Sequence, residues 1–247
     1  MNKFTLGIIQ DSLVAIGDEM FLAMQRSSMS PIIYESLDYA VGLTDEKGDL
    51  LAQGNGVTAF LACLDTVVQS TLDKYPLDSI HEGDVFIANT PFSGGGTLLS
   101  DVSVIIPIFF QGELIAFSVN KAHWTELGGT YAGSVSTVAT EIYQEGLHFP
   151  FIKIKSKGEL NQAVIDMIKA NVRLPDSTIG DLFAGIAAAE VGAKRVIELT
   201  EKYELETFTA AKEYMLAYGE ALSLAALKAL PKGTFTGKTL LEDDGSS

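Results

Sequence analysis

The residues with the clearest chemical potential are carboxylates and an imidazole that lie where apolar runs give way to loops. Asp101 follows the glycine-rich SGGGT loop, His123 follows the run LIAFSVNKA, and Asp38 opens a predicted strand. Functional sites are usually built where rigid strands end in flexible polar loops. Carboxylate and imidazole groups suit zinc, manganese or non-haem iron, and a metal with an open coordination position would activate water.

The same residues have a plainer interpretation. Asp and His beside loops commonly cap turns and hydrogen-bond the backbone, and spacing alone does not bring Asp38, Asp101 and His123 together. Glu126, together with Glu141 and Glu145, lies in or near the same loops and could supply a base. Carboxylates in loops are more often solvated surface groups, so both interpretations stay open for these glutamates.

Several well-marked sites are missing from the sequence. The SGGGT loop lacks the Gly-Lys-Ser/Thr ending of a phosphate-binding P-loop, and no G-x-S-x-G elbow of a serine hydrolase is present. The single cysteine, Cys63, lies in the apolar setting AFLACLDTVV, which favours a small buried residue over a catalytic thiol. Trp124 is interpreted as a core or loop anchor.

The composition narrows the class of protein. The chain has 247 residues, of which 47% are apolar, and a formal net charge of −15. A substantial core is therefore expected, and a nucleic-acid partner is not, because phosphate binding needs clustered Lys and Arg. The N-terminus lacks the uninterrupted apolar core of a signal peptide, and no run is long enough to span a bilayer. We expect a soluble, cytoplasmic protein without a membrane partner.

The patterning predicts an α+β fold in three regions. Residues 1–158 form a site-bearing region of helices and mostly antiparallel strands, with a helix over 3–27 that stops at Pro31, a helix over 56–75, and a hairpin that turns at Gln111-Gly112. Residues 159–230 form a helical layer, in which Pro175 ends the first helix. Residues 231–247 begin a further β region that is cut short or completed by another chain.

Long motifs in order resemble one family. They are SLDYAVGLTDEKGDLLAQG, GDVFIANTPFSGGGTLLSDVSVIIPIF, NKAHWTELGG, TEIYQEGLHFP and IKANVRLPDSTIGDLFAGIAAAEVGAKRVIEL. Together they cover nearly the whole chain, which resembles the N-terminal half of the B-type subunit of the hydantoinase/oxoprolinase family. That family includes subunits of acetone and acetophenone carboxylases.

The resemblance implies one part of a hetero-oligomeric ATP-dependent enzyme. In such complexes an A-type subunit with an actin-like fold binds ATP and Mg²⁺ and phosphorylates a carbonyl oxygen, and the B-type subunit completes the reaction. The implied function is hydrolysis of a small-molecule cyclic amide, a hydantoin or lactam. The alternatives are an ATP-dependent ketone carboxylase subunit, or a structural subunit that has lost its metal.

The resemblance also implies site residues. Family members hold a divalent metal, Zn or Mn, with residues that correspond here to Asp38, Leu98, Asp101 and His123. Leu98 stands where the family has a His, which leaves Asp38, Asp101 and His123 as metal candidates and should weaken the site. His123, Asp101 and Glu126 are the candidate catalytic residues. Family members are about twice as long, so a second chain completing the B-type subunit is expected as a further partner.

Overall fold

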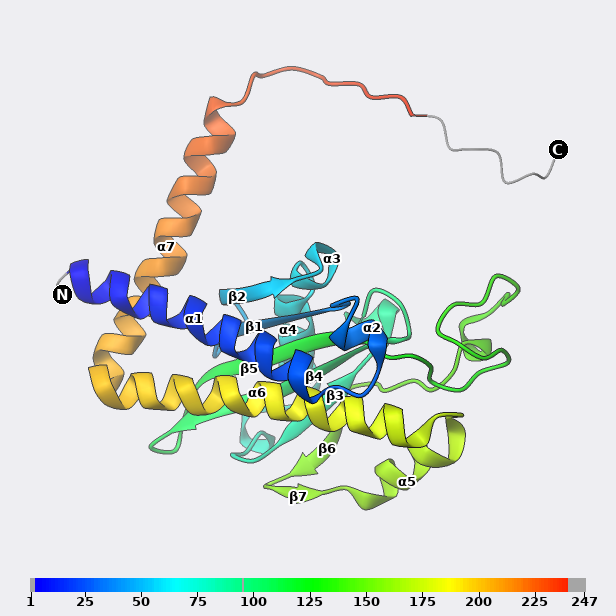
Figure 1. Ribbon diagram of the computed structural model, residues 1–247. Helices are drawn as coiled ribbons and strands as arrows, with labels where there is room; N and C mark the ends of the chain where they lie inside the picture. The colour runs from blue at the N-terminus through cyan, green and yellow to red at the C-terminus, as the bar shows by residue number, and fades with distance from the viewer. Residues whose placement is uncertain (1–2, 95, 240–247) are drawn as a thin grey trace.

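The computed structural model describes residues 3–94 and 96–239, which form one antiparallel sheet with helices on both faces (Figure 1). The sheet has seven strands in the order β2-β1-β5-β4-β3-β6-β7. Its strands are β1 (Tyr39–Asp45), β2 (Leu50–Gly56), β3 (Val85–Ala88), β4 (Asp101–Phe110), β5 (Glu113–His123), β6 (Ile152–Ser156) and β7 (Glu159–Leu160). The predicted α+β class with mostly antiparallel strands is confirmed.

The helices divide between the two faces of the sheet. They are α1 (Lys3–Ser27), α2 (Pro31–Tyr34), α3 (Thr58–Leu61), α4 (Leu64–Lys74), α5 (Gln162–Asn171), α6 (Pro175–Tyr203) and α7 (Leu205–Ala229), with short 3-10 turns η1 (Leu77–Ser79), η2 (Pro91–Ser93) and η3 (Ile142–Gln144). The long helices α1 and α6 cover one face, where the larger hydrophobic core lies, and α4 covers the other with a smaller core.

The long hairpin of β4 and β5 turns at Gln111 and Gly112, as the sequence predicts. Both residues have positive φ, 53° and 84°, as a tight hairpin turn of the right twist requires. Pro107 lies in β4, a central strand, although proline usually indicates an edge. It pairs with Phe117 of β5. The pairing of β4 with β3 covers only Ser103–Ile105, so the missing N–H of Pro107 removes no hydrogen bond to β3.

Two prolines begin helices where the sequence pattern suggested that they end them. The first helix ends at Ser27, and Pro31 is the first residue of α2; likewise α5 ends at Asn171, and Pro175 begins α6. Proline at the first helical position lacks only an N–H that would have no helical partner. The helix predicted over 56–75 is two helices, because Ala62 and Cys63 break the pattern.

The helical region shares its core with the sheet. Leu182, Ile186 and Ala189 of α6 lie in the same buried cluster as Val104 of β4. The division at residues 158 and 230 stays a prediction. No strand forms within residues 231–239, and the rest of the strand predicted near the C-terminus, residues 240–247, lies outside the described residues.

Helix α1 lies close against β2 where Gly17 meets Gly54. A Cβ atom added to Gly17 would lie 2.8 Å from the backbone nitrogen of Gly54, and one added to Gly54 would lie 2.6 Å from the Gly17 oxygen. We expect Gly17→Ala to lower the free energy of unfolding by about 1–3 kcal/mol, because backbone atoms cannot move aside. Gly7→Ala, in the same helix with open space around it, should be neutral or stabilising in the same chemical denaturation experiment.

Candidate functional site

Loops from four strands meet at one end of the sheet. β1 and β4 begin at this end, and β5 and β3 finish there, because each of these strands runs antiparallel to the next one in the sheet. The buried Asn89 ties the loops together: its side-chain nitrogen donates to the carbonyl oxygens of Leu99 and Leu147 at 2.7 and 2.9 Å, and its oxygen accepts from the Phe149 N–H at 2.6 Å. The candidate residues at this end of the sheet are therefore held on ordered loops.

A β-bulge places Asp101 opposite His123. Next to the hairpin turn, Phe109 pairs with Leu114, but Ile108 pairs with Ala116, so Ile115 is an extra residue in β5. Without this bulge the register would put Asp101 opposite Ala122, and the His123 side chain would point to the other face of the sheet. The bulge lies near the turn, yet it determines which side chain is paired with Asp101 at the far end of the hairpin.

Asp101 and His123 form the centre of the candidate site. His123 Nδ1 lies 2.8 Å from Asp101 Oδ1, and both residues are buried. The other carboxylate oxygen, Oδ2, accepts hydrogen bonds from the Thr97 hydroxyl and from the Leu98 N–H. With the proton on Nδ1, the carboxylate fixes the orientation of the ring and leaves Nε2 as a base.

Asp38 joins the same group from the beginning of β1. Its carbonyl oxygen accepts the His123 backbone N–H at 3.0 Å. Burial raises the pKa of the Asp38 carboxyl above its ordinary value of 3.8, with His123 opposing that rise and Asp101 adding to it. The three predicted residues therefore lie within electrostatic reach of one another, and Asp101 and His123 are in direct contact.

The structure adds a charged residue that the sequence reasoning did not single out. Lys121 is fully buried in β5, two residues before His123, and is paired with Ser103 of β4 and Ala40 of β1. Burial lowers the pKa of the Lys121 ammonium to about 8, against the opposing charges of Asp101 and Cys63. The sequence could have indicated Lys121, because it is a lysine inside an apolar strand and lies two residues from His123, on the same face of that strand.

Lys121→Met is expected to stabilise the chain at neutral pH. Because the folded pKa is lowered, the folded chain binds this proton less tightly than the unfolded chain does. Wild-type stability should therefore rise with pH from about 8 to the ordinary lysine value of 10.5. The methionine variant should lack this rise and gain about 1–3 kcal/mol at pH 7. Urea unfolding at pH 7 and pH 10 measures both; a less stable variant at pH 7 would contradict the argument.

An open cavity lies beside the loop that contacts Asp101. It has a volume of about 380 Å³ and is lined by Thr97 and Leu98, which both contact Asp101, and by residues that include Phe92, Glu141, Ile142 and Glu145. This volume suits a small molecule. Two of the glutamates considered as bases thus lie around the cavity, and Leu98, which is 41% exposed, stands at its wall.

The buried Glu126 has a different set of partners. One carboxylate oxygen accepts the N–H groups of Arg173 and Leu174, and the other accepts the Gly128 N–H at 2.9 Å and the Arg173 guanidinium at 3.2 Å. These contacts tie the loop after β5 to the segment between α5 and α6. They favour a positioning role, and the assignment of Glu126 as a base stays a prediction.

The expected metal site is not assembled by these residues. Within residues 3–94 and 96–239, no group of three or more His, Cys, Asp or Glu side chains is placed to hold a metal ion. The imidazole that the family resemblance requires is absent, because Leu98 takes its place. The residues as placed do not fit a metal, so we derive no step through one, and the triad of Asp38, Asp101 and His123 stays a prediction.

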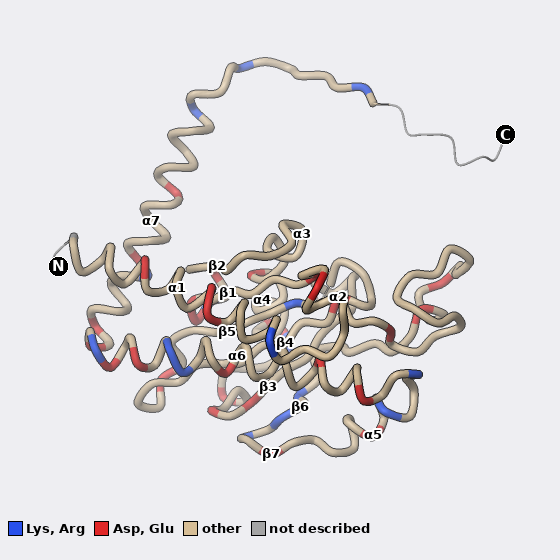
Figure 2. The backbone as a smooth tube through the Cα atoms, in the orientation of Figure 1, with Lys and Arg blue, Asp and Glu red and all other residues tan. Residues whose placement is uncertain are grey.

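The charge distribution offers no basic surface among the described residues. Figure 2 shows Lys and Arg scattered along the backbone among more numerous acidic residues. Among the helices that the structure describes, none combines the length and apolar character needed to cross a membrane.

The chain matches a family model and several known proteins. The sequence model of the Hydantoinase B/oxoprolinase family matches residues 2–247. Caprolactamase subunit beta of Pseudomonas jessenii is 30% identical over 99% of this chain and 42% of its own length. The 5-oxoprolinase of Saccharomyces cerevisiae is 31% identical over all of this chain and 20% of its own length. The chain therefore spans less than half the length of these relatives.

Two solved structures share the fold. The crystal structure of the ATP-dependent caprolactamase from Pseudomonas jessenii matches with a TM-score of 0.90 and 29% identity, over 99% of this chain and 42% of that chain. The nucleotide-free structure of acetone carboxylase matches with a TM-score of 0.79 and 20% identity, over 85% of this chain and 28% of that one. At the lower identity the likeness concerns the fold alone.

Proposed function

The chain belongs to the Hydantoinase B/oxoprolinase family, and we propose that it is a subunit of an ATP-dependent complex that opens a cyclic amide, a hydantoin or lactam. The observation that carries this proposal is the Asp101–His123 pair beside an open cavity, in a chain that matches the ATP-dependent caprolactamase over almost its whole length. An A-type partner subunit binds ATP and phosphorylates the amide oxygen.

In this proposal His123 acts on the water that attacks the activated amide. Phosphorylation of the amide oxygen makes the ring carbon electrophilic and turns that oxygen into part of a phosphate leaving group. Nε2 of His123 takes a proton from water as it adds to the ring carbon, and returns it to the ring nitrogen as the C–N bond breaks. The ring-opened product of this step is an acyl phosphate, which a second water hydrolyses to a carboxylate and inorganic phosphate. Asp101 holds the ring in the required tautomer and stabilises the imidazolium, which is the role of a buried carboxylate behind a catalytic histidine.

The experiment is a substrate panel offered to the natively purified complex. ADP release and product are measured with caprolactam, 5-oxoproline, a hydantoin, and acetone with and without bicarbonate, and metal content is measured in the same sample. Ring opening of an amide without bicarbonate supports the proposal. Turnover of a ketone that needs bicarbonate would instead identify a carboxylase. Turnover that survives removal of both Asp101 and His123 side chains would identify a structural subunit.

A further inference from the structure

The cavity beside the candidate site has a partly apolar lining. Its lining residues come from two segments of the chain, within residues 91–99 and 139–145. The first segment contributes Phe92 and Leu98, which are 89% and 41% exposed, and the second contributes Ile142, which packs on the core. Large apolar side chains left exposed at a cavity are typical of a surface that binds an apolar ligand. The ring of a small lactam, which is mostly methylene groups, is a ligand of this kind.

The charged side chains that line the cavity are acidic. They are Glu141 and Glu145, and among the ion pairs within residues 3–94 and 96–239 none involves either carboxylate. The whole loop between β5 and β6, residues 124–151, contains no Lys or Arg. Figure 2 shows this loop with acidic segments and without a basic one. The lining segments therefore give the cavity a negative charge.

An arginine that contacts the same loop does not compensate this charge. The Arg173 guanidinium donates to the Gly129 carbonyl oxygen at 2.8 Å, but it also pairs with the buried Glu126 carboxylate at 3.2 Å. Its positive charge is therefore balanced within the protein. A carboxylate on a bound ligand would meet Glu141 and Glu145 and, among the described lining residues, no cation.

We propose that this cavity binds the ring of an uncharged cyclic amide and discriminates against cyclic amides that carry a carboxylate. The inference rests on the proposed function, because it names the substrate class of that same site. Phe92, Leu98 and Ile142 contact the ring, and each methylene group that they bury raises affinity about three- to fourfold. Glu141 and Glu145 repel an anionic substituent, and the repulsion is stronger in a cavity than in bulk water.

The phosphoryl group of the activated amide occupies a different position from a substrate carboxylate. In 5-oxoproline, the amide oxygen and the carboxylate are attached to the two ring carbons on either side of the ring nitrogen. The side of the ring that carries the carboxylate can therefore face the two glutamates while the phosphorylated oxygen points away from them. Repulsion of the carboxylate does not require repulsion of the phosphoryl group.

Two lactams that differ only in a carboxylate test the preference. 2-Pyrrolidone and 5-oxoproline have the same lactam ring, and 5-oxoproline adds the carboxylate. With the natively purified complex and ATP, we expect kcat/KM for 2-pyrrolidone to exceed that for 5-oxoproline by about 10-fold or more, with most of the difference in KM. Equal values for the two lactams, or a preference for 5-oxoproline, would overturn the proposal.

Two double variants assign the preference to the cavity. Glu141→Gln/Glu145→Gln removes both carboxylates and keeps their size, so it should lower the ratio of the two kcat/KM values about fivefold or more, through a lower KM for 5-oxoproline. Glu113→Gln/Glu159→Gln is the matched control, because it changes the net charge equally at exposed positions in β5 and β7. The control should keep the wild-type ratio. Equal changes in the two variants, or no change in the first, would overturn the proposal.

The preference and the proposed function can fail separately, because the Kd of each lactam for the same complex is also measured by ligand-observed NMR titration. If no cyclic amide is opened but 2-pyrrolidone binds about 10-fold or more tightly than 5-oxoproline, the function is overturned and the preference stands. If 5-oxoproline is opened as efficiently as 2-pyrrolidone, the preference is overturned and the function stands. If neither lactam is opened, equal Kd values for the two overturn the preference.

Discussion

Replacing Asp101 with asparagine is expected to lower amide-opening turnover by about 10²–10⁴-fold while the complex still assembles. Asp101 accepts three donors: His123 Nδ1 on one oxygen, and the Thr97 hydroxyl and Leu98 N–H on the other. An asparagine has only one acceptor oxygen, so its amide NH₂ must face a donor or force His123 into the other tautomer. In that tautomer Nε2 carries the proton and cannot take one from water.

Thr97→Val serves as the matched control for Asp101→Asn. It removes one donor to the carboxylate and keeps the charge, so turnover should fall only about 10-fold. Both variants are compared for single-turnover rate and for assembly by size-exclusion chromatography. Unchanged turnover in Asp101→Asn would remove the pair from the mechanism.

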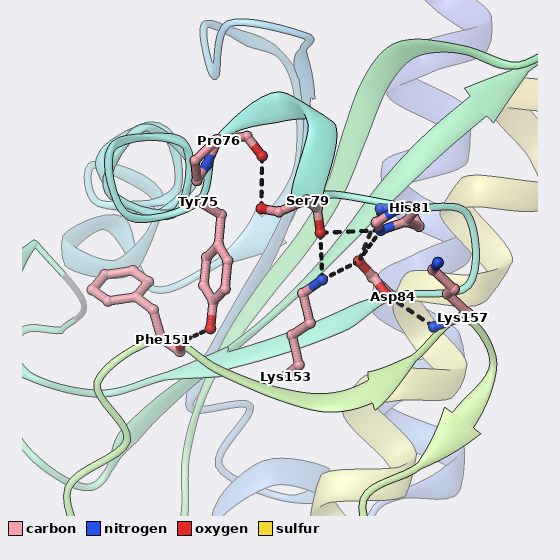
Figure 3. Close-up of polar contacts among 8 residues, drawn as sticks. All are labelled: Tyr75, Pro76, Ser79, His81, Asp84, Phe151, Lys153 and Lys157. Atoms are coloured by element: carbon pink, nitrogen blue, oxygen red, sulfur yellow. Dashed lines mark hydrogen bonds and ion pairs between the residues drawn. The ribbon is translucent and has the colours of Figure 1, made fainter.

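Asp84→Asn is expected to lower the free energy of unfolding by about 2–4 kcal/mol. Figure 3 shows the reason: fully buried Asp84 accepts the Lys153 ammonium at 2.7 Å and the N–H groups of His81 and Lys157 at 2.9 Å. These bonds fasten β6 to the turn before β3. The Lys153 ammonium also donates to the Ser79 carbonyl oxygen, and it lies 5.5 Å from the centre of the Tyr75 ring. Asparagine leaves that ammonium, whose side chain is only 20% exposed, without its counter-charge.

The pH dependence of this effect has a definite sign. Burial would raise the pKa of the Asp84 carboxyl, but the Lys153 ammonium and the backbone N–H groups outweigh it and lower the pKa below 3.8. The carboxylate therefore contributes stability that is fully present above the unfolded value of 3.8 and is lost as pH falls through the lower folded value. Wild type and Asp84→Asn should converge in stability as the pH is lowered through that window.

The control for Asp84→Asn is an exposed ion pair on the neighbouring surface. Lys155 and Glu190 lie 2.8 Å apart with side chains 22% and 54% exposed. Glu190→Gln should change the free energy of unfolding by about 1 kcal/mol or less, because water screens the pair. Urea unfolding of the three proteins at pH 7 gives the comparison. Equal losses in Asp84→Asn and Glu190→Gln would contradict the role assigned to burial.

The sequence predicted the elements better than it predicted their boundaries. Periodicity identified the first helix, and the Gln111-Gly112 dipeptide identified the central hairpin. Pro31 and Pro175 were misassigned because proline is compatible both with a helix end and with a first helical residue. Local context cannot separate these two uses; the packing of the following segment does.

The candidate site was predicted in its members but not in its geometry. Asp101 and His123 stood out as polar residues at strand ends, and they are in contact. That contact depends on the extra residue Ile115, and a bulge of one residue leaves no clear mark in an apolar strand. Glu126 looked equally available in the sequence, yet its contacts with Arg173 come from a segment 47 residues away. Long-range partners of this kind are set by the tertiary fold.

The most direct measurement quantifies ADP and ring-opened product in the same reaction, with complexes that contain either the wild-type chain or His123→Ala. Both complexes should assemble, and the wild type should form ring-opened product from one lactam in proportion to ADP. We expect His123→Ala to form that product at least about 100-fold more slowly, because the base that activates water is gone. Equal rates of product formation in the two complexes would contradict the role of His123 as that base.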